Sequence, residues 1–533
     1  MPSLDWIGKK AVVNHHKQVP FHLLHQNIEL SAGDPDSKNL LVQGDNLVAL
    51  KALLPYYAGQ VKCVIIDPPY NTGEQNWAYN DNVNSPEMKN WLGKVVGKEM
   101  EDLTRHDKWL CMMYPRMQLL VQFLRPDGFL FVCLDDVEIA RFRLMMEEIL
   151  PPKNYITTLI WKSRRNLDNR SLHNVSSDHE YVVAYRMGDN AFRGQEKDMD
   201  KYSNPDNDPR GPWMSDNLVG LATKDRRPNL HYDLINPETG DVYPCHQKGW
   251  RYSKETIEQK ISEGRILWPA SKTGRPRHKK FAEDLKSEFA GFSSFINCGN
   301  TNEGTEEVSR IMGDEQFIFP KPRTLVQTLL QQTTTDDDLI LDSFGGTGTT
   351  AHAVLAQNAA DGGNRRFILI EMDESICKTV TSERLKRVMG GYSYINNTGK
   401  TIDVEGIHGG FRFCELGEPL FSADGSINKA VTFKELAHHI FFIATGEPLP
   451  PATDFSTPFL GTSNNIAVYL LYNGILGDND EEGGNVLTRA VLSRLPKHEG
   501  TKIVYGNGCL LGSSHLNREN IIFRQIPYEV RCS

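Results

Sequence analysis

Several features that define whole classes of protein are missing from this sequence. The nine cysteines are scattered and include no Cys-x-x-Cys pair, so we expect neither a zinc ribbon nor a disulfide framework, but a reduced, cytoplasmic protein. No apolar run reaches the roughly 18 residues of a membrane span. The first ten residues lack the apolar core of a signal peptide. We therefore expect a protein that does not enter a membrane.

The signatures of several enzyme classes are also missing. There is no His-Glu-x-x-His motif of metalloproteases, no Gly-x-Ser-x-Gly motif of serine hydrolases and no Gly-x-x-x-x-Gly-Lys-Ser/Thr loop. We therefore expect neither a catalytic metal nor a covalent serine nucleophile. Any nuclease or helicase activity that accompanies this protein would belong to a separate subunit.

The sequence has no large excess of positive charge. Its net charge is −9, which by itself disfavours a polyanionic partner such as nucleic acid. The charge is uneven, because residues 162–290 carry 23 basic against 20 acidic residues, whereas residues 401–533 carry 10 against 15. A middle segment able to contact an anion is therefore followed by an acidic tail.

The order of apolar runs and helical stretches predicts an α/β fold. Pro-, Gly-, Asp- and Asn-rich sequence interrupts this pattern for about 120 residues, a length typical of a functional insertion or a separate domain. We expect strands at 61–67, 129–134, 156–161, 180–185, 339–342 and 367–371, and helices at 138–150, 349–357 and 374–388. The predicted parts are a first core segment (1–189), an inserted domain (190–304), a second core segment (305–400) and a C-terminal domain (401–533).

The first motif that can carry chemistry is Asp67-Pro68-Pro69-Tyr70, at the end of an apolar strand and followed by Asn71-Thr72-Gly73. The two prolines fix φ and remove two amide donors, which favours a rigid pocket. A carboxylate acceptor before them and a flat aromatic ring after them suit an exocyclic amine on a planar base. The alternative is an ordinary Pro-Pro strand end in which the tyrosine belongs to the core.

The second motif is the segment 341–351 (LDSFGGTGTTA), which runs from a strand into a helix. Its glycines allow close approach of a ligand to the backbone, and the helix N-terminus offers free amides. Glu371, which lies 23 residues after Gly348, ends the next strand and is placed to accept hydrogen bonds from ribose hydroxyls. The same pattern satisfies the dinucleotide fingerprint of NAD enzymes, so alone it predicts only an adenosine-type ligand on an open α/β sheet.

Taken together, the two motifs favour methyl transfer to a base amine, because hydride transfer has no use for the first motif. Here the sequence resembles the amino-methylating DNA methyltransferases of the permuted (β) order, in which Asp-Pro-Pro-Tyr precedes the glycine motif and a target-recognition region lies between them. Further matches are Asn39–Leu47 (NLLVQGDNL), Phe319–Pro322 (FPKP) and Asn364–Asp373. The form resembles the modification subunits of type III restriction systems. The resemblance implies a Rossmann-like, circularly permuted sheet that binds S-adenosylmethionine.

The resemblance also implies roles for individual residues. Asp67 and the carbonyl of Pro68, held in place with Pro69, would accept hydrogen bonds from the amine of a flipped base, and Tyr70 would stack on that base. The cofactor would be surrounded by Asp342, Phe344, Gly345, Gly346, Gly348 and Glu371, with Asp45 and Lys321 as further candidates. We expect Asp135 to cap the helix at 138–150 rather than to contact a ligand.

Sequence readout is expected in the insertion, which the resemblance assigns as the target-recognition domain. Candidate DNA contacts there are Arg226, Arg227, Arg275, Arg277, Lys279 and Lys280, with a solvated surface loop as the alternative. Aspartate at the first catalytic position favours the N6 amine of adenine over the N4 amine of cytosine. The implied partners are double-stranded DNA, a second copy of the chain and a separate restriction subunit with helicase and nuclease activity. A DNA-recognition subunit without catalytic activity is the alternative of another class, and the intact motifs argue against it.

Overall fold

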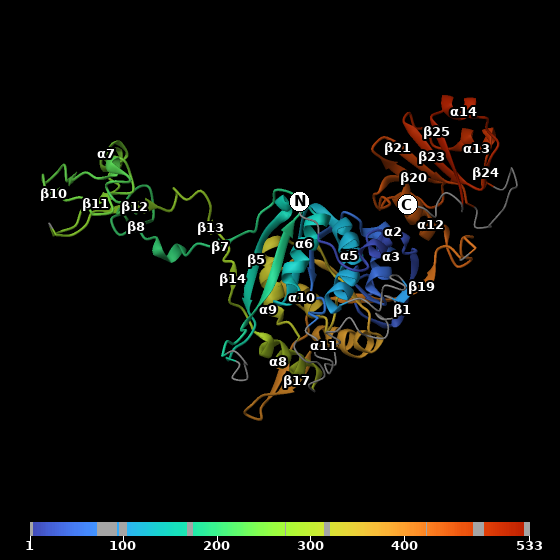
Figure 1. The fold of residues 1–533 in the computed structure, drawn as a ribbon, viewed down its shortest axis with the longest axis horizontal. Helices are drawn as coiled ribbons and strands as arrows, with labels where there is room; N and C mark the ends of the chain where they lie inside the picture. Colours follow the sequence, from blue (N-terminus) through green and yellow to red (C-terminus); the bar gives the residue numbers. More distant parts are fainter. Residues whose placement is uncertain are drawn as a thin grey trace. The chain divides into compact units, whose positions relative to one another are not determined.

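The computed structural model describes the chain except for residues 1–3, 72–92, 95–103, 168–173, 272, 314–319, 423, 473–483 and 527–533. Thr72, Gly73 and Phe319 of the predicted motifs therefore lie outside the described residues. The chain forms two compact units, which are a core unit (residues 1–192 and 293–533) and an inserted unit (residues 193–292). Figure 1 draws both with their elements labelled. Within the described ranges, no helix combines the length and the apolar character needed to cross a membrane.

The core unit is built on a ten-stranded sheet in the order β1-β19-β2-β16-β15-β3-β4-β6-β5-β14. The six strands from β19 to β4 are parallel, so their carboxyl ends meet at one edge of the sheet. The strands are β1 His22–Gly33, β2 Leu40–Gln43, β3 Val61–Ile66, β4 Leu124–Leu134, β5 Tyr155–Lys162, β6 His179–Arg186, β14 Phe295–Ile296, β15 Leu339–Asp342, β16 Arg366–Glu371 and β19 Gly410–Pro419.

Helices cover both faces of this sheet, because its central strands are apolar on both sides. Val64 and Ile66 of β3 belong to a buried cluster with residues of α3 (Asn46–Tyr57), α5 (Arg105–Phe123) and α6 (Ile139–Ile149). Cys63 points to the opposite face, where its sulfur accepts a hydrogen bond from Thr333 of α9 (Arg323–Thr333), which packs on α10 (Thr349–Asp361). The remaining helices of the core unit before residue 400 are α1 Lys9–Val12, α2 His15–Gln18, α8 Thr301–Met312 and α11 Ser382–Gly390.

The predicted strands and the helix at 349–357 are confirmed within a few residues at each end. The helix predicted at 374–388 differs, because it begins with a π-helical turn, Ile376–Thr381, that continues into α11. The prediction for Asp135 is wrong. The residue at the N-cap of α6 is Glu138, and the carboxylate of Asp135 instead accepts a hydrogen bond from the Val137 amide in the preceding turn.

The division of the chain differs from the predicted one in two places. Residues 293–304 belong to the core unit, because β14 pairs with β5 and α8 begins at Thr301. The central sheet also extends past residue 400, because β19 lies between β1 and β2. Two short strands, β17 Tyr392–Ile395 and β18 Thr401–Val404, precede β19. A four-stranded sheet, β20-β21-β23-β25, and several short elements follow it. The elements after β19 are α12 Phe433–Thr445, β20 Phe459–Ser463, β21 Ile466–Leu470, β22 Val486–Leu487, α13 Arg489–Arg494, β23 Thr501–Gly506, β24 Gly508–Cys509, α14 Ser513–Arg518 and β25 Ile521–Gln525.

The inserted unit, green in Figure 1, has a small core of its own. Its elements are β7 Gln195–Glu196, β8 Trp213–Asn217, β9 Leu234–Ile235, β10 Val242–Tyr243, α7 Lys254–Ser262, β11 Ile266–Leu267, β12 Arg277–Phe281 and β13 Phe289–Ala290. Strands β11, β12 and β8 form a three-stranded sheet beside which Trp250 is fully buried. Entry strand β7 pairs with exit strand β13, so both ends of the unit lie next to each other.

Candidate active site

A cavity of about 560 Å³ opens at the carboxyl edge of the central sheet. It lies where the neighbouring parallel strands β3 and β15 end, since Asp67 follows β3 directly and Asp342 is the last residue of β15. The register that pairs Leu341 with Val64 brings these two carboxylates to the same edge. The two sequence motifs therefore meet in one cavity, at the position where open α/β sheets commonly bind ligands.

The first motif is held by side chains from other elements. The indole nitrogen of Trp109 donates a hydrogen bond of 2.6 Å to the Pro69 carbonyl. The hydroxyl of Tyr70 donates one of 2.8 Å to Oε2 of Glu180, on β6. Asn71 is buried with a left-handed backbone (φ 61°). Because these contacts fix the backbone and the ring, the motif forms a pre-shaped wall of the cavity.

Lys321 lies directly against the first motif. Its ammonium is 2.9 Å from Oδ2 of Asp67 and 3.3 Å from Oε2 of Glu180, and it stands 4.7 Å from the centre of the Tyr70 ring. Burial alone would lower the pKa of Lys321, but the carboxylates of Asp67 and Glu180 reverse that effect and raise it. Lys321 is therefore a protonated amine within a pair of carboxylates.

Hydrogen bonds to the side chains of Glu371, Thr381 and Arg384 hold the glycine loop in place. The carboxylate of Glu371 accepts a hydrogen bond of 2.7 Å from the Gly346 amide, and the hydroxyl of Thr381 donates one of 2.5 Å to the Gly346 carbonyl. The fully buried guanidinium of Arg384 donates to the carbonyl and hydroxyl of Thr347. A Cβ on Gly345 would lie 3.1 Å from the Ile370 carbonyl, so the loop follows the end of β16 more closely than a side chain comfortably allows.

Asp342 brings a second carboxylate to the cavity wall. It is 5% exposed, and it accepts hydrogen bonds from the Phe344 amide at 2.9 Å and the Thr350 hydroxyl at 2.6 Å. Burial nevertheless raises the pKa of Asp342 to about 7. A positively charged ligand group beside Asp342 would therefore stabilise the ionised form of this carboxylate.

We expect the Asp342→Asn variant, in the absence of ligand, to gain thermal stability relative to the parent at about pH 8 and less at about pH 5. The pKa of the folded carboxyl lies above its ordinary value of 3.8, so the folded parent binds the proton more tightly and loses stability as the pH rises towards about 7. Melting curves across this range measure the effect, with the exposed Asp337→Asn as the matched control. A gain that does not vary with pH would contradict a titrating Asp342.

Most of the predicted site residues come together in the cavity. It is lined by Asp67, Pro68, Pro69, Tyr70, Lys321, Asp342, Phe344, Gly345 and Gly346. Gly348, Glu371 and Asp45 are not among the described lining residues. Gly348 is the N-cap of α10, with φ 80°, and Glu371 accepts a hydrogen bond from the Gly346 amide of the loop. Asp45 caps α3 by accepting hydrogen bonds from the Leu47 and Val48 amides. Its assignment to the cofactor pocket stays a prediction.

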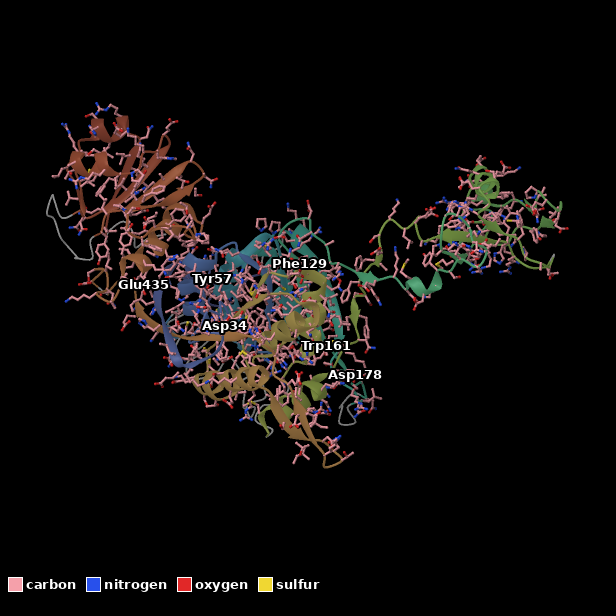
Figure 2. The ribbon with its side chains drawn as sticks, turned by 180° about the vertical axis from the view of Figure 1, so that it is seen from behind. Asp34, Tyr57, Phe129, Trp161, Asp178 and Glu435 are labelled. Carbon is pink, nitrogen blue, oxygen red and sulfur yellow. The ribbon has the colours of Figure 1, made fainter. Side chains whose placement is uncertain are left out.

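The cavity also contains residues that the sequence patterns did not single out. Glu180 lies on β6, next to β4 and β5 in the sheet. Arg164 and Arg165 follow β5 and bring positive charge to the cavity lining. Trp161 and Asp178, labelled in Figure 2, mark this end of β5 and β6. Asp135, which we expected to cap a helix, follows β4 and lines the cavity as well. The common signal is position, because these residues lie on or follow β4, β6 and β5, the next three strands of the sheet after β3.

The basic residues predicted in the inserted unit divide into two groups. Arg226, Arg227, Arg275 and Arg277 are exposed, and Lys280 is half-buried. Lys279 is different, because its side chain is only 6% exposed and its ammonium lies 2.5 Å from Asp206 and 2.7 Å from Asp208. This corrects its assignment, since a lysine that neutralises two carboxylates inside the fold is not presented to a phosphate.

Comparison with known proteins gives a consistent set of relatives. A family model described as DNA methylase, of N6 and N4 methyltransferases, matches residues 61–382. The chain is 28% identical to the type III restriction-modification enzyme StyLTI Mod subunit of Salmonella typhimurium, covering 88% of this chain and 71% of that protein. It is 26% identical to the EcoP15I Mod subunit of Escherichia coli (74% and 67%) and 31% identical to the type II methyltransferase M.KpnI of Klebsiella pneumoniae (66% and 84%).

Proposed function

The chain belongs to the DNA methylase family of N6 and N4 methyltransferases, and from this we propose that it transfers a methyl group from S-adenosylmethionine to the N6 amine of adenine in double-stranded DNA. The observation that carries the proposal is the meeting of the Asp67 carboxylate and the Tyr70 ring with the glycine loop in one cavity. One part of that cavity suits a base amine and the other an adenosine-type cofactor.

The residues of the loop side fit S-adenosylmethionine. Gly345 and Gly346 line the cavity, and because they lack side chains a ligand can approach the loop backbone closely. Asp342 and Phe344 line the cavity there and would surround the methionine part, whose charged groups suit the Asp342 carboxylate. Glu371, at the end of β16, would accept hydrogen bonds from the ribose once its contact with Gly346 yields. The cofactor supplies a methyl group on a positively charged sulfur.

The first motif would activate the amine. The lone pair of an adenine amine is conjugated into the ring and is a poor nucleophile. When Asp67 and the Pro68 carbonyl each accept one N–H, the nitrogen becomes pyramidal and its lone pair is released. The Pro69 carbonyl is already bound to Trp109 and does not compete for this role. As the methyl group passes to the nitrogen, its bond to the cofactor sulfur would break, and S-adenosylhomocysteine would leave. The nitrogen would become positive, the Asp67 carboxylate would stabilise that charge, and one N–H proton would then pass to solvent.

The target base would have to leave the duplex to reach this cavity. Stacking on Tyr70 would return about 1–3 kcal/mol of that cost. The exposed side chains of Arg164 and Arg165 are placed to attract the phosphates of the extruded nucleotide. The inserted unit would read the sequence, with Arg226, Arg227, Arg275 and Arg277 as its exposed cations.

The names of the relatives extend the proposal to partners. The StyLTI and EcoP15I proteins are called Mod subunits of type III restriction-modification enzymes. We propose the same assignment here, with a separate subunit for DNA cleavage and a second copy of this chain in the assembly. The M.KpnI relative is named as a type II methyltransferase, so a methyltransferase that acts without such a subunit is the second candidate.

We expect the product to be N6-methyladenine at a short, defined motif. The experiment incubates the purified chain with labelled S-adenosylmethionine and unmodified genomic DNA, then separates the nucleosides and maps the modified sites. The Asp67→Ala variant is the control for contaminating methyltransferases. Label in N4-methylcytosine would overturn the adenine assignment, and DNA binding without any transfer of label would favour the non-catalytic alternative.

A further inference from the structure

Lys321 stands where the mechanism places the target amine. It is an amine that donates to the Asp67 carboxylate at 2.9 Å and lies 4.7 Å from the centre of the Tyr70 ring. The Tyr70 ring is also the surface proposed for base stacking. Lys321 and the base amine therefore require the same carboxylate and the same ring.

The competition falls on one oxygen atom. Oδ1 of Asp67 is buried and has no hydrogen-bond partner among the described residues, whereas the Asp67 side chain as a whole is 34% exposed. Lys321 binds the other oxygen, Oδ2. The ammonium and a base amine therefore compete for Oδ2 as their acceptor.

The charge of Lys321 opposes the reaction as long as it stays on Asp67. A protonated lysine 2.9 Å from the carboxylate neutralises it, so less negative charge remains to stabilise the nitrogen as it becomes positive. Removing the ammonium entirely would leave the carboxylates of Asp67 and Glu180 close together with no cation between them. The site therefore needs a second anion that holds the ammonium away from the reacting nitrogen.

We propose that Glu180 is this second anion and is a positioning residue for methyl transfer, which rests on the function proposed above. Its Oε2 is 3.3 Å from the Lys321 ammonium and 2.8 Å from the Tyr70 hydroxyl, and its side chain is only 17% exposed. When the base amine takes Oδ2 of Asp67, Lys321 moves fully onto Glu180. Asp67 then faces the substrate with its charge uncompensated.

The aromatic rings of Trp161 and Tyr70 lie on the Lys321 ammonium and limit how far it can move. The ammonium lies 5.9 Å from the centre of the Trp161 ring, which is fully buried and held by a hydrogen bond of 2.9 Å from its indole nitrogen to the Gly299 carbonyl. Cation–π attraction to two fixed rings favours a small shift between the carboxylates over release of the lysine into solvent.

A double-mutant cycle tests this exchange. Glu180→Gln keeps the size of the side chain and an oxygen for the Tyr70 hydroxyl but loses the charge that receives Lys321. We expect the single-turnover methylation rate at saturating DNA to fall at least about tenfold, because the fraction of enzyme with a free Asp67 falls. The Lys321→Met variant has no ammonium for Glu180 to bind. In that background Glu180→Gln should lower the single-turnover methylation rate by less than about threefold.

The same cost of Glu180→Gln in both backgrounds would overturn the proposal, and so would no cost in the parent. Tyr70→Phe is the matched control, because it removes the hydroxyl that binds Glu180 and also acts on Asp67, while it leaves Lys321 in place. If the cost of Glu180→Gln disappears in Tyr70→Phe instead of in Lys321→Met, Glu180 acts through the tyrosine and the exchange is wrong. Melting curves and DNA affinity for each variant identify loss of folding. Failure of the parent itself to methylate any DNA would contradict the function proposed above, and is thereby distinguishable.

Discussion

Replacing Asp67 with alanine is expected to lower the rate of methyl transfer at least about 100-fold while DNA affinity stays within a few-fold of the parent. The carboxylate acts on charge that develops only as the amine gains its methyl group, and removal of one such oriented partner typically costs about 100-fold or more. DNA affinity depends mainly on phosphate contacts, which lie elsewhere. Filter binding and single-turnover methylation measure the two quantities separately.

Asp67→Asn is the matched variant, because it keeps an acceptor oxygen but loses the charge. It should fall between the parent and Asp67→Ala if both hydrogen bonding and charge contribute. Both variants should fold, since Lys321 keeps Glu180 as a partner at 3.3 Å. Near-normal single-turnover methylation by Asp67→Ala would show that another group stabilises the transition state.

The strands that position the site are those the sequence predicts best. Strand β15 begins and ends at the predicted residues, and β3 stops one residue short of its predicted end. Both are buried parallel strands, which appear in a sequence as continuous apolar runs bounded by polar or proline residues. The residues after such strands share an edge of the sheet, so local patterns place Asp67 and Asp342 at that edge, whereas their meeting depends on β3 lying next to β15.

Contacts between side chains that lie far apart in the sequence cannot be predicted in this way. Lys321 reaches Asp67 across 254 positions, and Tyr70 reaches Glu180 across 110. Neither contact has a local signature, because each depends on the order of strands in the finished sheet. Asp45 illustrates the opposite case, a contact that local sequence does indicate. An aspartate before a helix most often serves as its N-cap, and that local role accounts for its side chain here.

The inserted unit is connected in a way that favours its replacement. Strands β7 and β13 pair antiparallel beside its two ends, with Gln195 opposite Ala290. Gly194 adopts φ 94°, and a Cβ there would lie 2.2 Å from the Ala290 carbonyl, so glycine is required where the chain enters. Its buried cluster of Leu218, Tyr243, Trp250 and their neighbours lies entirely within residues 193–292.

Exchange of residues 193–292 for the equivalent segment of a relative is therefore expected to change the methylated motif completely while S-adenosylmethionine affinity stays the same. The chemistry uses side chains of the core unit, such as Asp67 and Asp342, whereas the exposed arginines proposed to read bases belong to the inserted unit. Modification mapping of the exchanged protein gives the motif, and calorimetry gives the cofactor affinity.

A variant with alanine at Arg226 and Arg227 is the finer test. It should reduce the discrimination between bases at individual positions of the motif by about 1–3 kcal/mol for each guanidinium that contacts a base. An unchanged motif after the exchange would place readout in the core unit, where Arg164 and Arg165 line the cavity.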